Sequence, residues 1–161
     1  MSLPKIRYVI DLMGATLPPR SGPVPGLRTI EPSDLEALAQ LMLDAYAGTI
    51  DSEDETLQDA IDEVASYLDA TPLLDHSFLY HAGGRALSAV LVSTFEGGPF
   101  IGYVITDPRH KRQGLATTVT KATLHSLRRA GHSRVVLYIT EGNTPSERLF
   151  RRLGAMPDPT T

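Results

Sequence analysis

Lys111-Arg112-Gln113-Gly114-Leu115-Ala116 separates an apolar run at residues 100–106 from a stretch with helical periodicity at residues 115–130. This order is typical of a strand, a turn and the start of a helix. A glycine lets the backbone of such a turn approach a ligand, and the first N–H groups of a helix have no partner within the helix. The segment therefore predicts a turn that can bind an anion.

A second strand and helix follow this one. Residues 134–140 form another apolar run, and residues 141–155 contain a polar turn and a short helical pattern. Two strands joined through a helix are ordinarily parallel, so the turns that follow them emerge at the same end of the sheet. We expect the two turns to converge on one ligand.

Both segments resemble the GNAT acyltransferase superfamily. Residues 111–116 resemble its Arg/Gln-x-x-Gly-x-Gly/Ala signature, with Lys111 where arginine or glutamine is usual. Residues 143–155 resemble the segment that commonly follows, Asn-x-x-Ala-x-x-x-Tyr-x-x-x-Gly-Phe, with Asn143 matching and Phe150 in place of the tyrosine. The last third of the chain carries the close resemblance, which extends to bacterial enzymes that acetylate protein N-termini and small amines.

The resemblance implies an α/β fold with a GNAT-type mixed, mostly antiparallel sheet flanked by helices on both faces. It implies an N-acetyltransferase that moves an acetyl group from acetyl-CoA to a primary amine by direct attack in a ternary complex. Coenzyme A is then a co-substrate, no metal is needed, and the acceptor is a small-molecule amine or a protein N-terminus. The alternative is a non-catalytic acyl-CoA sensor, because Phe150 has no proton to give to a departing thiolate.

Each part of acetyl-CoA requires a different feature of the protein. Backbone N–H groups at the start of a helix suit the pyrophosphate, and an incompletely paired strand end can hydrogen-bond to the peptide-like pantetheine arm. Asn143 would bridge that arm from the second strand. The predicted cofactor-binding residues are Val104, Ile105, Thr106, Lys111, Arg112, Gln113, Gly114, Leu115, Ala116, Thr117, Asn143, Ser146 and Phe150.

The acceptor amine must lose a proton. A lysine-like amine has a reference pKa of about 10.4 and is mostly protonated at neutral pH, so a base or a water chain is required. The candidates are Glu141, at the mouth of the second strand, and Tyr103 or Tyr138 acting through water. A backbone N–H near Val104 or Ile105 could stabilise the oxyanion.

Composition and charge restrict the other function classes. The chain has 161 residues, enough for one domain, and no cysteine, which excludes disulfides, thiolate metal sites and a cysteine nucleophile. Residues 1–100 carry 5 basic and 15 acidic residues, whereas residues 101–161 carry 10 and 4. The basic half favours a polyanionic cofactor and the acidic half a cationic acceptor. We expect a cytoplasmic protein without a nucleic-acid or membrane partner, since an aromatic platform and long apolar runs are both lacking.

The chain divides into residues 1–26, a strand arm and a Pro/Gly-rich linker, and residues 27–161, the acyl-CoA N-acyltransferase domain. The last helix is predicted to begin with a capping box of Thr144 and Glu147. The proline-broken tail after Gly154 leaves the sheet edge in need of cover, which residues 6–12 could supply within the chain or in a homodimer. The other expected elements are strands at residues 27–30, 77–81, 85–94, 100–106 and 134–140, and helices near residues 35–46, 56–68 and 115–130.

Overall fold

The computed structural model describes residues 3–14, 17, 22–49 and 52–158. The predicted linker falls partly outside these residues. The strands are β1 (Lys5–Asp11), β2 (Leu27–Thr29), β3 (Phe78–Ala82), β4 (Arg85–Phe95), β5 (Gly98–Thr106), β6 (Arg134–Thr140) and β7 (Met156–Pro157). The helices are α1 (Leu35–Tyr46), α2 (Leu57–Asp69), α3 (Leu115–Arg129) and α4 (Thr144–Arg152), with short 3-10 turns at Pro32–Asp34, Leu74–His76 and Pro108–His110.

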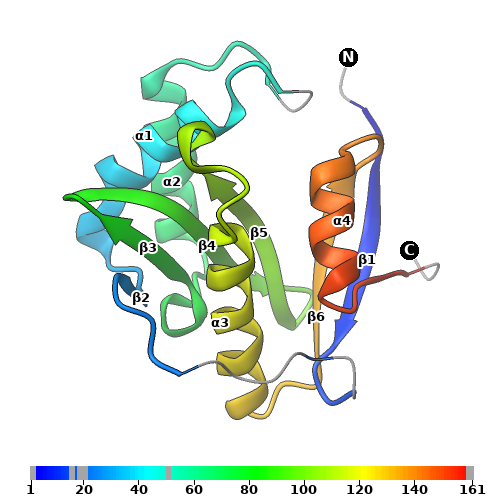
Figure 1. The fold of residues 1–161 in the computed structure, drawn as a ribbon. Helices are drawn as coiled ribbons and strands as arrows, with labels where there is room; N and C mark the ends of the chain where they lie inside the picture. Colours follow the sequence, from blue (N-terminus) through cyan, green and yellow to red (C-terminus); the bar gives the residue numbers. More distant parts are fainter. Residues whose placement is uncertain (1–2, 15–16, 18–21, 50–51, 159–161) are drawn as a thin grey trace.

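The strands form one sheet in the order β2-β3-β4-β5-β6-β1-β7. Every neighbouring pair is antiparallel except β5 and β6, which are parallel and joined through α3. Helices α3 and α4 cover one face of the sheet, and α1 and α2 cover the other face along β4 and β5 (Figure 1). This architecture confirms the predicted mixed, mostly antiparallel α/β fold.

Two apolar clusters hold the layers together, one on each face. Alternation along β4 divides its side chains between them, because Val90 and Val92 point toward α3 and α4, whereas Ala89 and Leu91 point toward α1 and α2. All four of these side chains are fully buried. The sheet is therefore a rigid middle layer from which the site is built.

The N-terminal arm is an internal strand of the sheet. Strand β1 pairs with β6 along its whole length and with β7 through Tyr8 and Val9. Arg7 also forms an ion pair with Asp158 at 3.0 Å, which fastens the tail after β7 to β1. The arm thus covers the edge of β6 within the chain, the first of the two predicted arrangements, and the homodimer stays a prediction.

The start of α4 differs from the predicted capping box of Thr144 and Glu147. Asn143 is the N-cap, and its Oδ1 accepts a hydrogen bond from the backbone N–H of Ser146 at 3.3 Å. Asparagine is among the strongest N-cap residues, so it takes the cap ahead of threonine. Thr144 becomes the first helical residue, and the Asn143 side chain is held at the end of β6.

Candidate active site

The functional site begins where β5 and β6 separate. Their parallel pairing has only two registered pairs, Phe100 with Val136 and Ile101 with Leu137. Beyond Ile101 the two strands diverge, so the β6-facing side of the β5 backbone from Tyr103 onward has no strand partner in the described sheet. Such unpaired N–H and C=O groups can bind a peptide-like ligand.

A β-bulge in β5 accompanies this separation. The register with β4 shifts between Leu91 and Val92, which pair with Tyr103 and Ile101, and Gly102 is the extra residue. Ile101 therefore packs with the α3 and α4 cluster, whereas Tyr103 packs with the α1 and α2 cluster. The bulge turns the Tyr103 side chain toward the helices α1 and α2 at the point where the strands part.

A cavity of about 670 Å³ occupies the separation between β5 and β6. Four of the predicted cofactor-binding residues line it. These are Val104 from β5, Asn143 from the cap of α4, and Ser146 and Phe150 from α4. Of the candidates for proton transfer, Tyr103 and Tyr138 also line it. The remaining lining residues come from α1, α2 and the loop between them, from β5 and β6, and from β1 and Leu3 before it, so the cavity is shared by both halves of the chain.

The structure does not bring every predicted residue into the cavity. Ile105 is buried against α1 and α2, and Thr106 bonds to Ser88 through their hydroxyls at 2.9 Å. Glu141 is exposed in the turn after β6 and is not among the residues that line the cavity. Residues 111–114 form a separate turn, and residues 115–117 are the first residues of α3.

That turn has the backbone conformation expected of an anion-binding site. Arg112 and Gly114 both have positive φ, 65° and 76°, and Gly114 is the N-cap of α3 without a side-chain cap. The first N–H groups of α3, which have no partner within the helix, therefore receive no hydrogen bond from a capping side chain either. The turn from Lys111 to Gly114 is exposed. Leu115 is buried and anchors the helix start in the core.

Asp107 fixes the segment that leads into this turn. Its buried carboxylate accepts hydrogen bonds from the backbone N–H of Arg109 at 2.9 Å and from the Arg109 guanidinium at 2.9 and 3.1 Å. The hydrogen bonds from Arg109 lower the pKa of Asp107 to about 2, with a further contribution from Arg85. The ionised carboxylate thus joins the end of β5 to the 3-10 turn Pro108–His110.

Replacing Asp107 by asparagine should lower the free energy of unfolding by about 1 to 2 kcal/mol at pH 7, a range that allows for the exposure of Arg109. Because the folded-state pKa lies below the unfolded value of about 3.9, this stabilisation is complete above that value and is lost as the pH falls toward 2. Urea unfolding at pH 7, 5 and 3 measures it. A wild-type advantage that is the same at pH 3 as at pH 7 would contradict the assignment.

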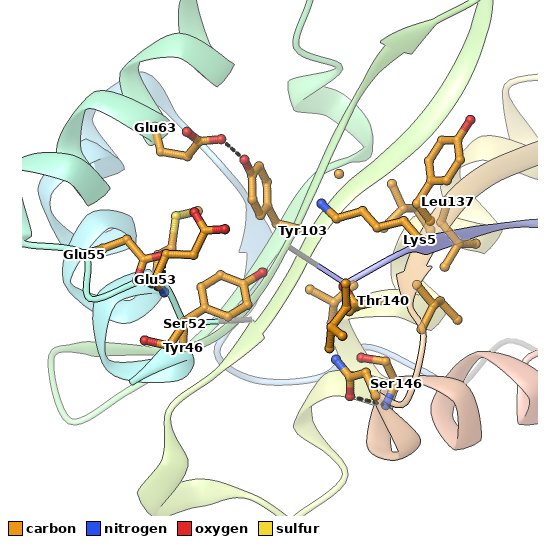
Figure 2. A pocket seen from close by; sticks show the side chains of 18 of the residues that line it. Lys5, Tyr46, Ser52, Glu53, Glu55, Glu63, Tyr103, Leu137, Thr140 and Ser146 are labelled. Atoms are coloured by element: carbon orange, nitrogen blue, oxygen red, sulfur yellow. Dashed lines mark hydrogen bonds between the residues drawn. The ribbon is translucent and has the colours of Figure 1, made fainter. Parts of the chain in front are cut away.

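The wall of the cavity that faces β6 and α4 is acidic. It is lined by Glu53 and Glu55 from the loop before α2 and by Asp59 and Glu63 from α2. Figure 2 shows Glu63 and Tyr103 on one side of the cavity, with Lys5 of β1 reaching in from the other. The cavity lining thus contains four carboxylates on this wall and one lysine on the other side, so its net charge is negative and favours a cationic ligand.

Glu63 and Tyr103 are directly connected. The Tyr103 hydroxyl donates a hydrogen bond to the Glu63 carboxylate. Burial, together with this hydrogen bond, raises the pKa of Tyr103 well above its ordinary value. Tyr103 is therefore a neutral phenol throughout the physiological pH range.

The sequence analysis did not single out Glu63, because the pattern of this helix indicates only an acidic face that also carries Asp59 and Asp62. Asp59 and Glu63 are four residues apart and lie on one side of α2, whereas Asp62 points elsewhere and accepts a hydrogen bond from Gln58. The i, i+4 spacing was the available signal. It could not indicate that this side of α2 faces a cavity.

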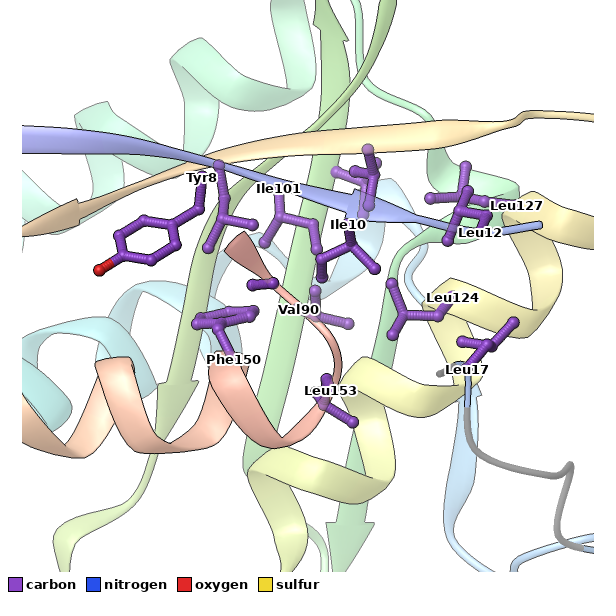
Figure 3. Close-up of a cluster of buried hydrophobic side chains, with 14 of the residues drawn as sticks. Tyr8, Ile10, Leu12, Leu17, Val90, Ile101, Leu124, Leu127, Phe150 and Leu153 are labelled. Atoms are coloured by element: carbon purple, nitrogen blue, oxygen red, sulfur yellow. The ribbon is translucent and has the colours of Figure 1, made fainter. Parts of the chain in front are cut away.

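Phe150 belongs to the core and to the cavity at once. It is 5% exposed, and Figure 3 shows it beside Val90 and Ile101. Its ring also contributes to the cavity lining from α4. Phe150 therefore provides an apolar surface between the sheet and the cavity and no hydroxyl.

The part of the chain that the structure describes shows neither a cluster of metal ligands nor a membrane-spanning helix. No three His, Asp or Glu side chains there gather closely enough to hold a metal ion. None of the helices described is both long and apolar enough to cross a membrane.

Comparisons with known proteins agree with this geometry. A family model described as FR47-like protein matches residues 79–158. A curated mycothiol acetyltransferase from Catenulispora acidiphila is 30% identical over 160 residues, which cover 91% of this chain and 49% of that protein. The chain thus spans about half the length of the curated relative it matches.

Solved structures share the fold. A GCN5-related N-acetyltransferase from Sphaerobacter thermophilus aligns with a TM-score of 0.73 and 21% identity, over 96% of this chain and 48% of that one. A GNAT family acetyltransferase from Brucella melitensis, in complex with acetyl-CoA, aligns with a TM-score of 0.59 and 19% identity, over 75% and 79%. With its separated strands β5 and β6, its uncapped α3 and these matches, the chain has the fold of the GNAT superfamily.

Proposed function

We propose that this chain is an N-acetyltransferase that moves an acetyl group from acetyl-CoA to a primary amine by direct attack in a ternary complex. The observation that carries this proposal is the separation of β5 and β6, which opens a cavity of about 670 Å³ beside an unpaired strand edge. The acetyltransferase name of the curated relative and the acetyl-CoA complex of the Brucella protein support it.

The residues present fit acetyl-CoA. Its diphosphate would bind the N–H groups that follow Gly114 and the basic side chains of Lys111 and Arg112, because this helix start has no side-chain cap. Its pantetheine arm would lie along the unpaired edge of β5 from Val104, with Asn143 on the opposite side. Ser146 and Phe150 would flank the arm from α4.

The acceptor would enter from the acidic wall. A small-molecule amine or a protein N-terminus is cationic before reaction, and Glu53, Glu55 and Asp59 would favour its approach over that of an anion. A backbone N–H at the bulge, near Val104, would stabilise the oxyanion that forms on the thioester carbonyl.

Thiol release from acetyl-CoA tests this function. The intact chain would be incubated with acetyl-CoA and one of three amines: spermidine, cysteamine or a short peptide with a free N-terminus. We expect thiol release above the rate of acetyl-CoA hydrolysis with at least one of these amines. Mass spectrometry should find the acetylated amine. Absence of acetyl-CoA binding would contradict the proposal.

A second function, an acyl-CoA sensor without catalysis, is favoured by one observation, the phenylalanine at position 150. A sensor should bind acetyl-CoA in calorimetry and give no thiol release above hydrolysis with any of the three amines. Binding and turnover together would exclude it.

Replacing Phe150 by tyrosine should leave acetyl-CoA affinity within about twofold of the wild-type value, because the ring already lines the cavity and a hydroxyl can point into it. The same variant shows whether a hydroxyl at this position increases turnover. Calorimetric titration and thiol release measure the two effects. A large loss of affinity would contradict the place assigned to Phe150 beside the arm.

A further inference from the structure

Tyr103 is placed to receive a proton and to pass one on. Its hydroxyl proton is directed at Glu63, so the lone pairs of its oxygen remain available to another donor. The side chain lies at the β5 bulge, where the strand edge opens into the cavity, and both residues line that cavity. Glu63 is itself exposed to solvent.

The other candidates are less well placed. The ring of Tyr138 packs against Phe95 and Phe100, with centroids 6.4 and 6.0 Å apart, and a hydrogen bond to Tyr138 is among the interactions that raise the pKa of Arg7. Glu141 does not line the cavity, and Phe150 has no hydroxyl. Tyr103 lines the cavity, and its hydroxyl is bonded directly to a carboxylate.

We propose that Tyr103 and Glu63 form a proton relay for the acceptor amine, an inference that rests on the proposed function. One N–H proton of the protonated amine passes to the Tyr103 oxygen while the phenol proton passes to Glu63, and exposed Glu63 returns this proton to water. The neutral amine nitrogen then bonds to the thioester carbonyl carbon, and the carbon–sulfur bond breaks with its electron pair on sulfur. The second proton that the nitrogen loses goes to the departing thiolate.

The raised pKa of Tyr103 agrees with a relay, because a phenol that stays protonated can exchange one proton for another without becoming a phenolate. Tyr103 is then the catalytic residue and Glu63 a positioning residue that accepts its proton. The other titratable side chains lining the cavity around this pair are Lys5, Tyr46, Glu53, Glu55, Asp59 and Tyr138.

The test compares Tyr103→Phe and Glu63→Gln with the wild type, using acetyl-CoA and the best acceptor of the three amines, from pH 6.5 to pH 10. Loss of general base catalysis typically costs about 100-fold, so we expect kcat/KM of Tyr103→Phe to fall about 100-fold at pH 7. Glu63→Gln should fall at least about tenfold, and Glu63→Asp should recover part of that loss. Both deficits should shrink toward pH 10, where more of the amine is already neutral.

The controls separate this role from a structural one. Tyr80→Phe on β3 and Asp62→Asn on α2 alter a matching side chain outside the cavity lining and should keep wild-type activity. Acetyl-CoA affinity of both relay variants should be unchanged in calorimetry, which also shows that they fold. If Tyr103→Phe does not fold, Glu63→Gln decides, because its side chain is exposed.

Each other outcome overturns a specific statement. Activity of Glu63→Gln within threefold of wild type, or a deficit that stays constant from pH 6.5 to pH 10, would overturn the relay and leave the acetyltransferase proposal standing. A wild-type chain that binds acetyl-CoA but acetylates none of the three amines would overturn both and favour the sensor.

Discussion

Gly114→Asp should weaken acetyl-CoA binding by at least about 100-fold, or about 2.8 kcal/mol. The carboxylate would lie beside the free N–H groups at the start of α3, where it repels the diphosphate and competes for its hydrogen-bond donors. A side chain at a φ of 76° also strains the turn, although no heavy atom lies within 4 Å of a Cβ placed there. Calorimetric titration with acetyl-CoA measures the loss.

Gly131→Asp is the matched control for this substitution. Gly131 follows the other end of α3, has a φ of 95° and has no heavy atom within 4 Å of a Cβ placed on it. The helix between the two glycines has 15 residues, or about 22 Å at a rise of about 1.5 Å per residue. The control should lose some stability and no affinity. Equal loss of affinity in both variants would mean that strain, and not the anion site, explains the first result.

Ile10→Ala should lower the free energy of unfolding by about 2 to 5 kcal/mol. Ile10 lies on β1 and is fully buried in the cluster beneath α3 and α4 (Figure 3). The substitution leaves a cavity in a region where β1 joins β6 to β7. Urea unfolding, followed by circular dichroism, measures the difference.

Ile6→Ala on the same strand is its control. Ile6 is 38% exposed, so truncation removes less buried surface than at Ile10, leaves no enclosed cavity and should cost about 1 kcal/mol. Similar costs for the two variants would indicate that β1 is not integrated in the sheet. A large difference supports an N-terminal arm that is part of the domain core.

Local patterns predicted most of the elements. The bounds of β6 agree with the apolar run at residues 134–140, and α3 begins at the residue after Gly114 as predicted. Periodicity, glycine and proline act within a few residues, so such bounds can be predicted from a single chain. The predicted N-cap of α4 was wrong by one residue, because asparagine and threonine are both favoured at this position. Only the hydrogen bond from the Ser146 N–H to the Asn143 side chain identifies Asn143 as the cap.

Long-range pairing could not be predicted in the same way. Alternation of buried and exposed residues indicates that β1 is a strand, but it does not identify β6 and β7 as its neighbours more than 100 residues away. The place of Glu63 in the cavity lining was missed for a related reason. Which side of α2 faces the cavity depends on how α2 packs against α1 and on the bulge that turns Tyr103 toward it.

The resemblance in the last third of the chain identified candidate cofactor-binding residues, which local patterns alone could not do. Asn143 and Phe150 stand at positions of the motif, and both line the cavity between the separated strands. The segment at residues 111–116 could be matched because its glycine and basic residues are close together in the sequence. The acidic wall comes from α2 and the loop before it, where the resemblance is only in the order of elements.

The central claim is that the free amides at the start of α3 hold a diphosphate. Paired calorimetric titrations of the intact chain with coenzyme A and with pantetheine, which has the same arm but neither the phosphates nor the adenosine, test it most directly. We predict saturable binding of coenzyme A and binding of pantetheine at least about 100-fold weaker. Equal affinities for the two compounds, or no heat with coenzyme A, would contradict it.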